Sequence, residues 1–290
     1  MEFNEVETIF KKRKWNIINN VTPVKNPIAI LLGGQGAVGK GNLNIYAKKV
    51  FRTSNFLEIN GDLYREYHPK FDKLIRTRTF SQETQIFSKV FTEKLIETAI
   101  EKSFNIIVEG TMKNPQTTLN TIDKLDKAGY KIYAYVIAAP QELSSLNSYI
   151  RYAKEVSIKG SGRLIDMQSH DEACQNLPKT IDILYKKKCV RKILVFDLFA
   201  ESLIKEYTLT EKGYDHDVKP SVLIGLIRKR TLQDKSITEQ IISKAAQLDL
   251  PGDLRSNIDG IIQKIQIRQN EQNIKTEKPS FIQKIFSKKP

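Results

Sequence analysis

Short apolar runs alternate with longer amphipathic stretches along much of the chain. Each run is strand-sized and nearly continuous, which is typical of strands that are buried on both faces of a sheet. The runs are Ile28–Leu32, Phe56–Ile59, Phe104–Val108, Ile132–Ala138 and Ile193–Phe196. This pattern predicts strands at the centre of a sheet.

Segments with helical spacing lie between these strands. They are Asn42–Phe51, Phe80–Lys102, Pro115–Ala128, Glu142–Lys154 and Pro178–Lys186. Strands and helices that alternate in this way form parallel sheets with right-handed crossovers, which place helices on both faces. The sequence therefore predicts an α/β fold with a central, mostly parallel sheet flanked by helices.

The strand pattern is confined to the middle of the chain. We predict a helical or irregular lead-in over residues 1–26 and a core over residues 27–205, with a lid region at about residues 150–178. Residues 206–290 are expected to form a mainly helical C-terminal extension. Its predicted segments are two polar helices and a basic tail, at Ser221–Ile242, Asp259–Gln269 and Lys275–Pro290.

Composition narrows the class of protein. The 290 residues include 47 Lys and Arg against 33 Asp and Glu, a formal net charge of +14, which favours acidic partners. No apolar stretch is long enough to span a bilayer, and we see no signal peptide, so we expect a cytoplasmic protein without a membrane segment. The two cysteines, Cys174 and Cys189, are too few for a disulfide framework or a zinc site.

A glycine loop follows the first predicted strand and opens a helix. It fits the pattern G-x-x-x-x-G-K of the Walker A phosphate loop, in which glycines let backbone N–H groups surround an anion and the lysine reaches the β- and γ-phosphates. The predicted nucleotide-binding residues are Gly34, Gln35, Gly36, Ala37, Val38, Gly39, Lys40 and Gly41. Gly41 stands where the motif has Ser or Thr, whose hydroxyl usually binds Mg²⁺.

Charged residues follow the second and third predicted strands. Asp62 and Glu109 are expected at the edge of the sheet that carries the loop, because ligands of parallel sheets collect at the carboxyl ends of the strands. An aspartate there can accept a proton from an attacking hydroxyl or help to hold Mg²⁺. Arg151 and the glycine-flanked Arg163 are candidate lid arginines that hold phosphate.

Several motifs in this order resemble the zeta toxin family, the kinase half of bacterial epsilon/zeta toxin–antitoxin systems. They are Gly34–Gly41, Ile59–Tyr64, Tyr67–Asp72, Val108–Thr111, Tyr133–Pro140, Ile150–Tyr152, Arg163, His170–Asp171 and Asn176–Pro178. The resemblance implies a P-loop kinase-like fold and transfer of phosphate from ATP or GTP to the 3′-hydroxyl of UDP-N-acetylglucosamine, which inhibits cell-wall synthesis. It also implies Mg²⁺ as cofactor and an epsilon-type antitoxin as partner.

Roles carry over to the matching positions of this sequence. The resemblance implies that Lys40 binds phosphate, that Asp62 is the catalytic base, and that Arg151 and Arg163 hold the phosphates during transfer. The place of Asp62 at the end of the second strand also makes it the candidate metal ligand. By the same resemblance Glu109 and Thr111 contact the sugar nucleotide. Lys113, also assigned to substrate binding, stands where the family would have an arginine.

Other functions remain open at this point. A nucleotide-binding protein in which Gly41 has weakened catalysis keeps the same loop, and so does a P-loop kinase for another small molecule. A nucleic-acid enzyme is disfavoured because the lysines are scattered and no aromatic residues are interleaved with a basic stripe.

Overall fold

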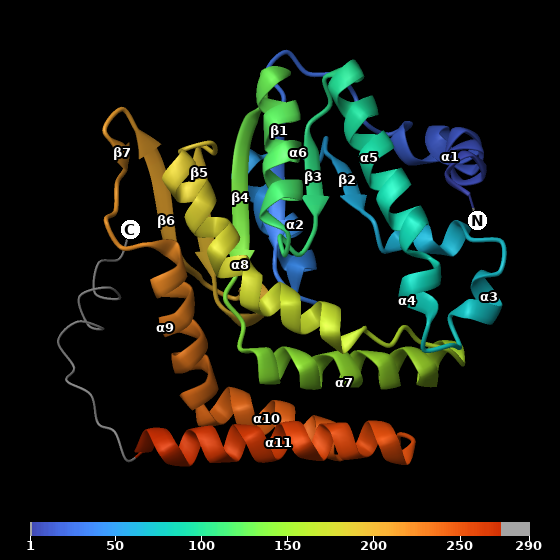
Figure 1. Cartoon of the computed structure of the whole chain (residues 1–290). Helices are drawn as coiled ribbons and strands as arrows, with labels where there is room; N and C mark the ends of the chain where they lie inside the picture. Colours follow the sequence, from blue (N-terminus) through green and yellow to red (C-terminus); the bar gives the residue numbers. More distant parts are fainter. Residues whose placement is uncertain (1, 274–290) are drawn as a thin grey trace.

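A computed structural model of the chain describes residues 2–273, with a seven-stranded sheet at its centre (Figure 1). The order of strands is β2-β3-β1-β4-β5-β6-β7. The first five strands in this order pair in parallel, and β6 and β7 continue the sheet at one edge with antiparallel pairing. The strands are β1 (Ile28–Gly33), β2 (Leu57–Asn60), β3 (Ile106–Glu109), β4 (Lys131–Ile137), β5 (Lys192–Phe196), β6 (Leu203–Thr210) and β7 (Gly213–Tyr214).

Helices cover both faces of the sheet. In the view of Figure 1, α5, α6 and α8 lie in front of the sheet and α2 lies behind it, while α10 and α11 lie below α7. The first helices are α1 (Phe3–Ile18), α2 (Lys40–Phe51), η1 (Leu63–Tyr67), α3 (Phe71–Leu74), α4 (Phe80–Glu83), α5 (Gln85–Lys102) and α6 (Pro115–Lys127). The remaining helices are α7 (Gln141–Lys159), α8 (Met167–Lys187), η2 (Leu198–Ala200), α9 (Pro220–Gln233), α10 (Lys235–Ala246) and α11 (Gly252–Asn273).

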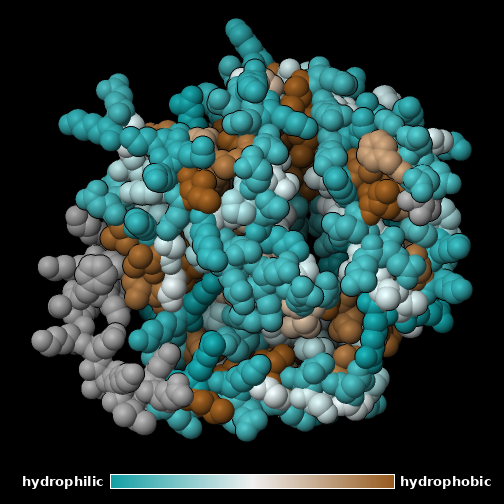
Figure 2. Space-filling model, viewed as in Figure 1, coloured by the Kyte–Doolittle hydropathy of each residue, from teal (hydrophilic) through white to brown (hydrophobic). Residues whose placement is uncertain are grey.

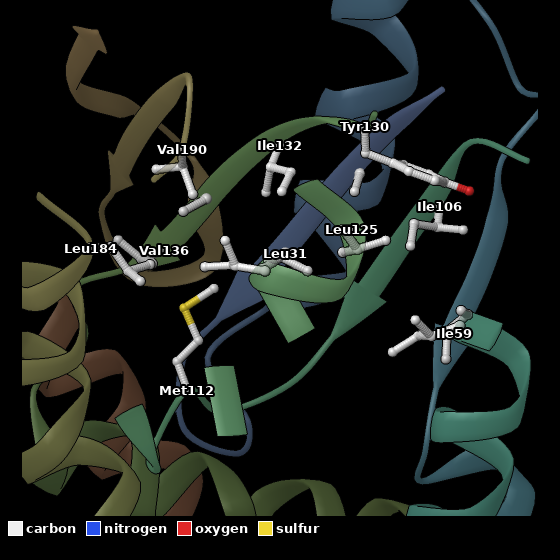
Figure 3. Close-up of a cluster of buried hydrophobic side chains, with 14 of the residues drawn as sticks. Leu31, Ile59, Ile106, Met112, Leu125, Tyr130, Ile132, Val136, Leu184 and Val190 are labelled. Atoms are coloured by element: carbon white, nitrogen blue, oxygen red, sulfur yellow. The ribbon is translucent and has the colours of Figure 1, made fainter. Parts of the chain in front are cut away.

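The sheet separates two hydrophobic cores. Neighbouring residues of a strand point to opposite faces, so Ala29 and Leu31 of β1 enter one core while Ile30 and Leu32 enter the other. Figure 3 shows the first core, in which strand residues such as Ile106 lie among side chains of the covering helices. Burial on both faces explains why these strands read as continuous apolar runs.

The fold class predicted from the sequence is confirmed. Each of the five predicted strands is present, with its ends within two residues of the expected positions. The parallel register aligns the carboxyl ends of β2, β3 and β1, because Asn60 pairs with Glu109 and Glu109 pairs with Leu32. The segments that follow these strands therefore meet at one edge of the sheet. Every helix within residues 2–273 is too short or too polar to cross a membrane.

The helix predicted at Pro178 begins eleven residues earlier, at Met167. Asp166 caps it by accepting a hydrogen bond from the backbone of Gln168, and the helix continues through Pro178. A proline inside a helix has no N–H to donate to the carbonyl four residues before it. Nη1 of Arg228, from α9, donates to this carbonyl of Cys174 at 2.9 Å, so tertiary structure replaces the missing bond.

Two other predicted helices are each divided in two. Phe80–Lys102 breaks at Thr84, whose φ of −99° and ψ of 2° are not helical. Ser221–Ile242 breaks at Asp234, which caps α10 by accepting from the backbone of Ile237. Hydrophobic spacing continues across both breaks, so periodicity alone does not reveal them.

The antiparallel strands were not predicted. The sequence of β6 mixes polar and apolar residues, and the strand is mostly half-buried, unlike the apolar runs of the parallel strands. It spans the boundary expected at residue 205 and joins the C-terminal region to the sheet through β5. The predicted basic tail, Lys275–Pro290, lies outside the described residues.

Candidate active site

The glycine loop connects β1 to α2, as the motif predicts. Gly39 caps the amino end of α2 with a φ of 89°, and a Cβ atom there would lie 2.7 Å from Cα of Phe199 in η2. Only glycine fits this close approach and this left-handed backbone. The backbone N–H groups at the start of α2 are thereby held at the edge of the sheet, where they can bind an anion.

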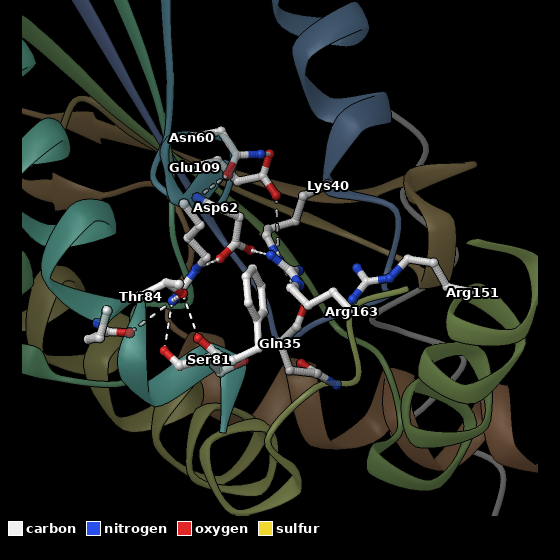
Figure 4. Close-up of polar contacts among 12 residues, drawn as sticks. Gln35, Lys40, Asn60, Asp62, Ser81, Thr84, Glu109, Arg151 and Arg163 are labelled. Atoms are coloured by element: carbon white, nitrogen blue, oxygen red, sulfur yellow. Dashed lines mark hydrogen bonds and ion pairs between the residues drawn. The ribbon is translucent and has the colours of Figure 1, made fainter. Parts of the chain in front are cut away.

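The side chain of Lys40, the first residue of α2, extends back towards the glycine loop. Its ammonium donates to the carbonyl oxygens of Gly34 at 2.9 Å and Gln35 at 2.8 Å, and it lies 3.8 Å from Oε1 of Glu109. Burial lowers the pKa of Lys40, and the carboxylates of Glu109 and Asp62 partly offset this effect. These contacts place one lysine charge directly above the loop (Figure 4).

Glu109 ends β3 beside the lysine. Its Oε2 accepts a hydrogen bond of 2.9 Å from the side-chain amide of Asn60, the last residue of β2. Oδ1 of Asn60 in turn accepts from the backbone N–H of Asp62 at 3.0 Å. Asn60 therefore links the two acidic residues, which the sequence places 47 positions apart.

Asp62 lies between two arginines. Its Oδ1 accepts from Nε of Arg65 at 2.9 Å, and its Oδ2 lies 2.8 Å from Nη1 of Arg163. Burial by itself would raise the pKa of Asp62, but the charges and hydrogen bonds of Arg163 and Arg65 outweigh this effect and lower the pKa to about 2. The carboxylate is therefore ionised at neutral pH.

Arg151 reaches the same region from α7. Its Nε lies 3.7 Å from Oε1 of Glu155, while Oε2 of Glu155 accepts from the backbone N–H of Arg163 at 2.8 Å. Within the described part of the chain, Nε and Nη2 of Arg151 are buried without a hydrogen-bond partner. Buried guanidinium donors without partners are costly in a free protein and are suited to an anionic ligand.

The structure thus brings together five of the predicted residues. Figure 4 shows Lys40, Asp62, Glu109, Arg151 and Arg163 around one space at the carboxyl ends of β1, β2 and β3. In the space-filling view the face that carries α6 and α8 is mainly hydrophilic, and a hollow opens in it between α6 and α5 (Figure 2).

Three other predicted residues lie around this group. Thr111 is half-buried after β3, and its hydroxyl is 3.4 Å from the backbone nitrogen of Lys113. The ammonium of Lys113 binds Ser169 at 2.8 Å and Glu172 at 3.2 Å, both in α8. Gly41 is exposed at the start of α2, and a Cβ atom there would meet no atom within 4 Å.

The sequence analysis missed Arg65, which holds Asp62 and is itself almost fully buried. The available signal was the spacing of three residues between opposite charges in one helical turn. The sequence analysis also gave no indication that the side chain of Gln35 lies inside the protein, where it donates to the carbonyl of Ala139 and the hydroxyl of Ser144. That hydroxyl also bonds to His170, whose other ring nitrogen bonds to Asp171.

No cluster of three or more His, Cys, Asp or Glu within residues 2–273 is arranged to hold a metal by itself. Mg²⁺ in phosphate-transfer sites is usually held by one or two carboxylates together with phosphate oxygens and water. The carboxylates at the edge of the sheet, Asp62 and Glu109, meet that smaller requirement. The residues present are therefore compatible with an ion that a bound nucleotide helps to hold.

The fold and the site define the class of protein first. A glycine loop between a buried parallel strand and a helix, with charged side chains at the carboxyl edge of the sheet, is the arrangement of a kinase-like P-loop protein. The sequence profile of the family described as Zeta toxin matches residues 12–208. The chain belongs to the zeta toxin family, which confirms the resemblance drawn from its motifs.

Curated relatives carry the same family name. Toxin zeta of Enterococcus hirae is 29% identical over 175 residues, which cover 59% of this chain and 60% of that protein. Toxin PezT of Streptococcus pneumoniae serotype 4 is 32% identical over 152 residues, which cover 51% of this chain and 59% of that protein. The chain matches about 60% of the length of these relatives.

A solved structure supports the same fold. It comes from the characterisation of the PezAT chromosomal toxin–antitoxin system of Streptococcus pneumoniae, with a TM-score of 0.65 at 20% identity. The match covers 95% of this chain and 100% of that chain. At this identity the similarity shows the fold alone.

Proposed function

We propose that this chain is a kinase that transfers the γ-phosphoryl group of ATP or GTP to the 3′-hydroxyl of UDP-N-acetylglucosamine. The observation that carries the proposal is the meeting of five charged side chains from separate segments at the end of the glycine loop. Three are cations and two are carboxylates, which are the groups that phosphoryl transfer to a hydroxyl requires. Membership of the zeta toxin family supports the choice of acceptor.

The cationic side would bind the nucleotide. The β- and γ-phosphates would lie over the loop, where Lys40 exchanges its bonds to loop carbonyls for bonds to phosphate oxygens. The unpartnered donors of Arg151 would bind the γ-phosphate together with Arg163. The two guanidinium groups would stabilise the charge that develops during transfer.

The acidic side would bind and activate the acceptor. We assign Glu109 and Thr111 to contacts with the sugar nucleotide and Asp62 to the acceptor hydroxyl. As the hydroxyl oxygen bonds to the γ-phosphorus, the bond from that phosphorus to the bridging oxygen breaks and the nucleoside diphosphate leaves with the electron pair. The proton of the hydroxyl passes to the carboxylate of Asp62.

Mg²⁺ would neutralise phosphate charge when it is bound with the nucleotide. We assign it to Asp62, with Glu109 as the neighbouring carboxylate, because Gly41 offers no hydroxyl at the usual position. The open space around Gly41 means that packing does not require a glycine there.

An acceptor assay tests this proposal. Purified protein is incubated with ATP, Mg²⁺ and UDP-N-acetylglucosamine, and the sugar nucleotide is analysed by mass spectrometry and by NMR of the sugar ring. We expect a gain of one phosphoryl group on the 3′-oxygen, and no gain with Lys40→Met. Unmodified sugar nucleotide, with nucleotide binding confirmed by calorimetry, would contradict the proposed acceptor.

A second function is favoured by Gly41: a nucleotide-binding protein whose catalysis is weakened by the missing hydroxyl. In that case nucleotide binds as expected, no acceptor is phosphorylated, and Gly41→Ser restores transfer. A kinase for another small molecule would instead give a product in a screen of other hydroxyl acceptors.

We also propose that a small antitoxin binds the chain and covers the nucleotide site in the cytoplasm. The proposal rests on family membership and on the likeness to a structure from the PezAT system. Co-expression with the product of the adjacent reading frame, followed by purification, tests it. A stable complex that no longer binds nucleotide is expected, whereas a complex that still binds nucleotide would contradict blocking of the site.

A further inference from the structure

Both carboxylate oxygens of Asp62 are occupied by arginines. Oδ1 is bonded to Arg65 and Oδ2 to Arg163. A carboxylate that accepts a proton from a substrate hydroxyl needs one oxygen facing that hydroxyl. Each carboxylate oxygen can accept two hydrogen bonds, but an arginine paired with the accepting oxygen stabilises its negative charge and so weakens it as a base. Release of one arginine would therefore strengthen the base, and the surroundings of the two arginines indicate which one leaves.

Arg65 is fixed in place. It comes from η1, and its side chain is 9% exposed. Nη1 donates to the carbonyl oxygen of Ser81 at 2.8 Å and to the hydroxyl of Thr84 at 2.9 Å, and Nη2 donates to Oε1 of Gln85 at 3.0 Å (Figure 4). Moving this guanidinium would separate a buried charge from its partners, among them the fully buried hydroxyl of Thr84, which is strongly unfavourable.

Arg163 is held much less firmly. It lies in residues 160–166, which connect α7 to α8 without regular structure, and its side chain is 21% exposed. Its guanidinium pairs with Asp62, which is itself 44% exposed. Ion pairs with this degree of exposure contribute only about 0.2–1 kcal/mol, so a ligand that offers more negative charge can displace the carboxylate.

We propose that Arg65 is the positioning residue of Asp62 and that Arg163 is exchanged from Asp62 to the nucleotide. Arg65 keeps Oδ1 in place and so presents Oδ2 to the acceptor. When nucleotide binds, its phosphate competes with Oδ2 for Arg163, and the transfer of this arginine both completes the phosphate site and frees the base. The catalytic part of this inference rests on the proposed kinase function.

The exchange predicts a measurable competition in the free protein. Asp62→Asn weakens the competitor for Arg163, so nucleotide should bind more tightly, by about two- to fivefold beyond the effect of losing one negative charge. Glu109→Gln is the matched control, because it removes a charge beside Lys40 that is not paired with Arg163. Calorimetry with ATP is done without Mg²⁺, so that a metal contact of Asp62 does not contribute.

The same measurement in an Arg163→Met background completes the test. There Asp62→Asn and Glu109→Gln should change the dissociation constant by similar factors, because the exchanged arginine is gone. If Asp62→Asn has the same effect with and without Arg163, the exchange is wrong while the kinase proposal stands. If the unaltered protein binds no nucleotide, the proposed function is wrong and the exchange is wrong with it.

Kinetics test the positioning role of Arg65. Arg65→Met should lower kcat at least tenfold and leave the nucleotide dissociation constant nearly unchanged, and Arg65→Lys should recover part of the loss. In an Asp62→Asn background, Arg65→Met should cost nothing more, because the group it positions no longer acts as a base. Thermal melting confirms that Arg65→Lys and Arg65→Met are both folded. The positioning role is contradicted if Arg65→Met lowers kcat equally in both backgrounds, or if neither variant changes kcat.

Discussion

The glycine after the phosphate-loop lysine gives the sharpest test of metal binding in this site. Gly41 is the second residue of α2, it is exposed, and a Cβ atom there meets no neighbour within 4 Å. Gly41→Ser and Gly41→Ala therefore both fit without rearrangement. Alanine is about 1 kcal/mol more favourable than glycine in a helix and serine roughly half as much, so neither variant should lose stability.

The two variants differ only in one hydroxyl group. If that hydroxyl replaces a water molecule on Mg²⁺, a net gain of about 0.5–1.5 kcal/mol is expected, comparable to one hydrogen bond. The Mg²⁺ concentration for half-maximal phosphoryl transfer should then fall about two- to tenfold in Gly41→Ser. Gly41→Ala should keep the requirement of the unaltered protein.

The assay is the rate of sugar-nucleotide phosphorylation at saturating nucleotide as Mg²⁺ is varied. Thermal unfolding of both variants, expected at or a few degrees above that of the unaltered protein, confirms that the fold is intact. Equal Mg²⁺ requirements for Gly41→Ser and Gly41→Ala would refute the reasoning that the missing hydroxyl limits metal binding.

Three further predictions concern the loop and the base. Lys40→Met should weaken nucleotide binding about 10- to 150-fold, the value of a charge-assisted hydrogen bond, and an unchanged dissociation constant would contradict the role of Lys40. Gly39→Ala should lower the free energy of unfolding by about 2–5 kcal/mol in urea, because of its positive φ and the close backbone of Phe199, and a loss no larger than that of Gly41→Ala would contradict this account. The pKa of Asp62 is lowered from 3.8 to about 2, so its stabilising effect is present above pH 4 and is lost as the pH falls through 2. The stability difference between the unaltered protein and Asp62→Asn should therefore shrink over that interval, and a constant difference would contradict the ion pairs.

The sequence was sufficient for the parallel part of the fold. Strands buried on both faces are apolar at every position, so Ile132–Ala138 could be recognised without knowledge of its neighbours. The half-buried β6 lacked that signal, and its place was set by pairing with β5. The start of α8 was missed because Pro178 normally begins a helix, whereas here Arg228 satisfies the carbonyl that the proline leaves without a donor.

The candidate site also combines residues that the sequence could reveal with residues that only tertiary contacts reveal. Topology alone brings Asp62 and Glu109 to the edge that carries the loop, so strand-end reasoning found them. Asn60, which holds Glu109, is recognised as its partner only from the contact between β2 and β3, whereas Arg65 lies three residues from Asp62 and was overlooked although its spacing offered a signal. Local sequence also could not show that Lys113 reaches α8, because its partners lie more than 50 residues away.

The most direct test of the central claim is the turnover of UDP-N-acetylglucosamine by the unaltered protein and by Asp62→Asn, with nucleotide affinity measured for both. Loss of a positioned base typically lowers the rate about 10²–10⁴-fold. We predict that Asp62→Asn lowers kcat by such a factor while nucleotide binds at least as tightly as before. Equal turnover by the two proteins would contradict the assignment of Asp62 as the base, and no turnover by the unaltered protein at saturating Mg²⁺ would contradict the proposed kinase activity itself.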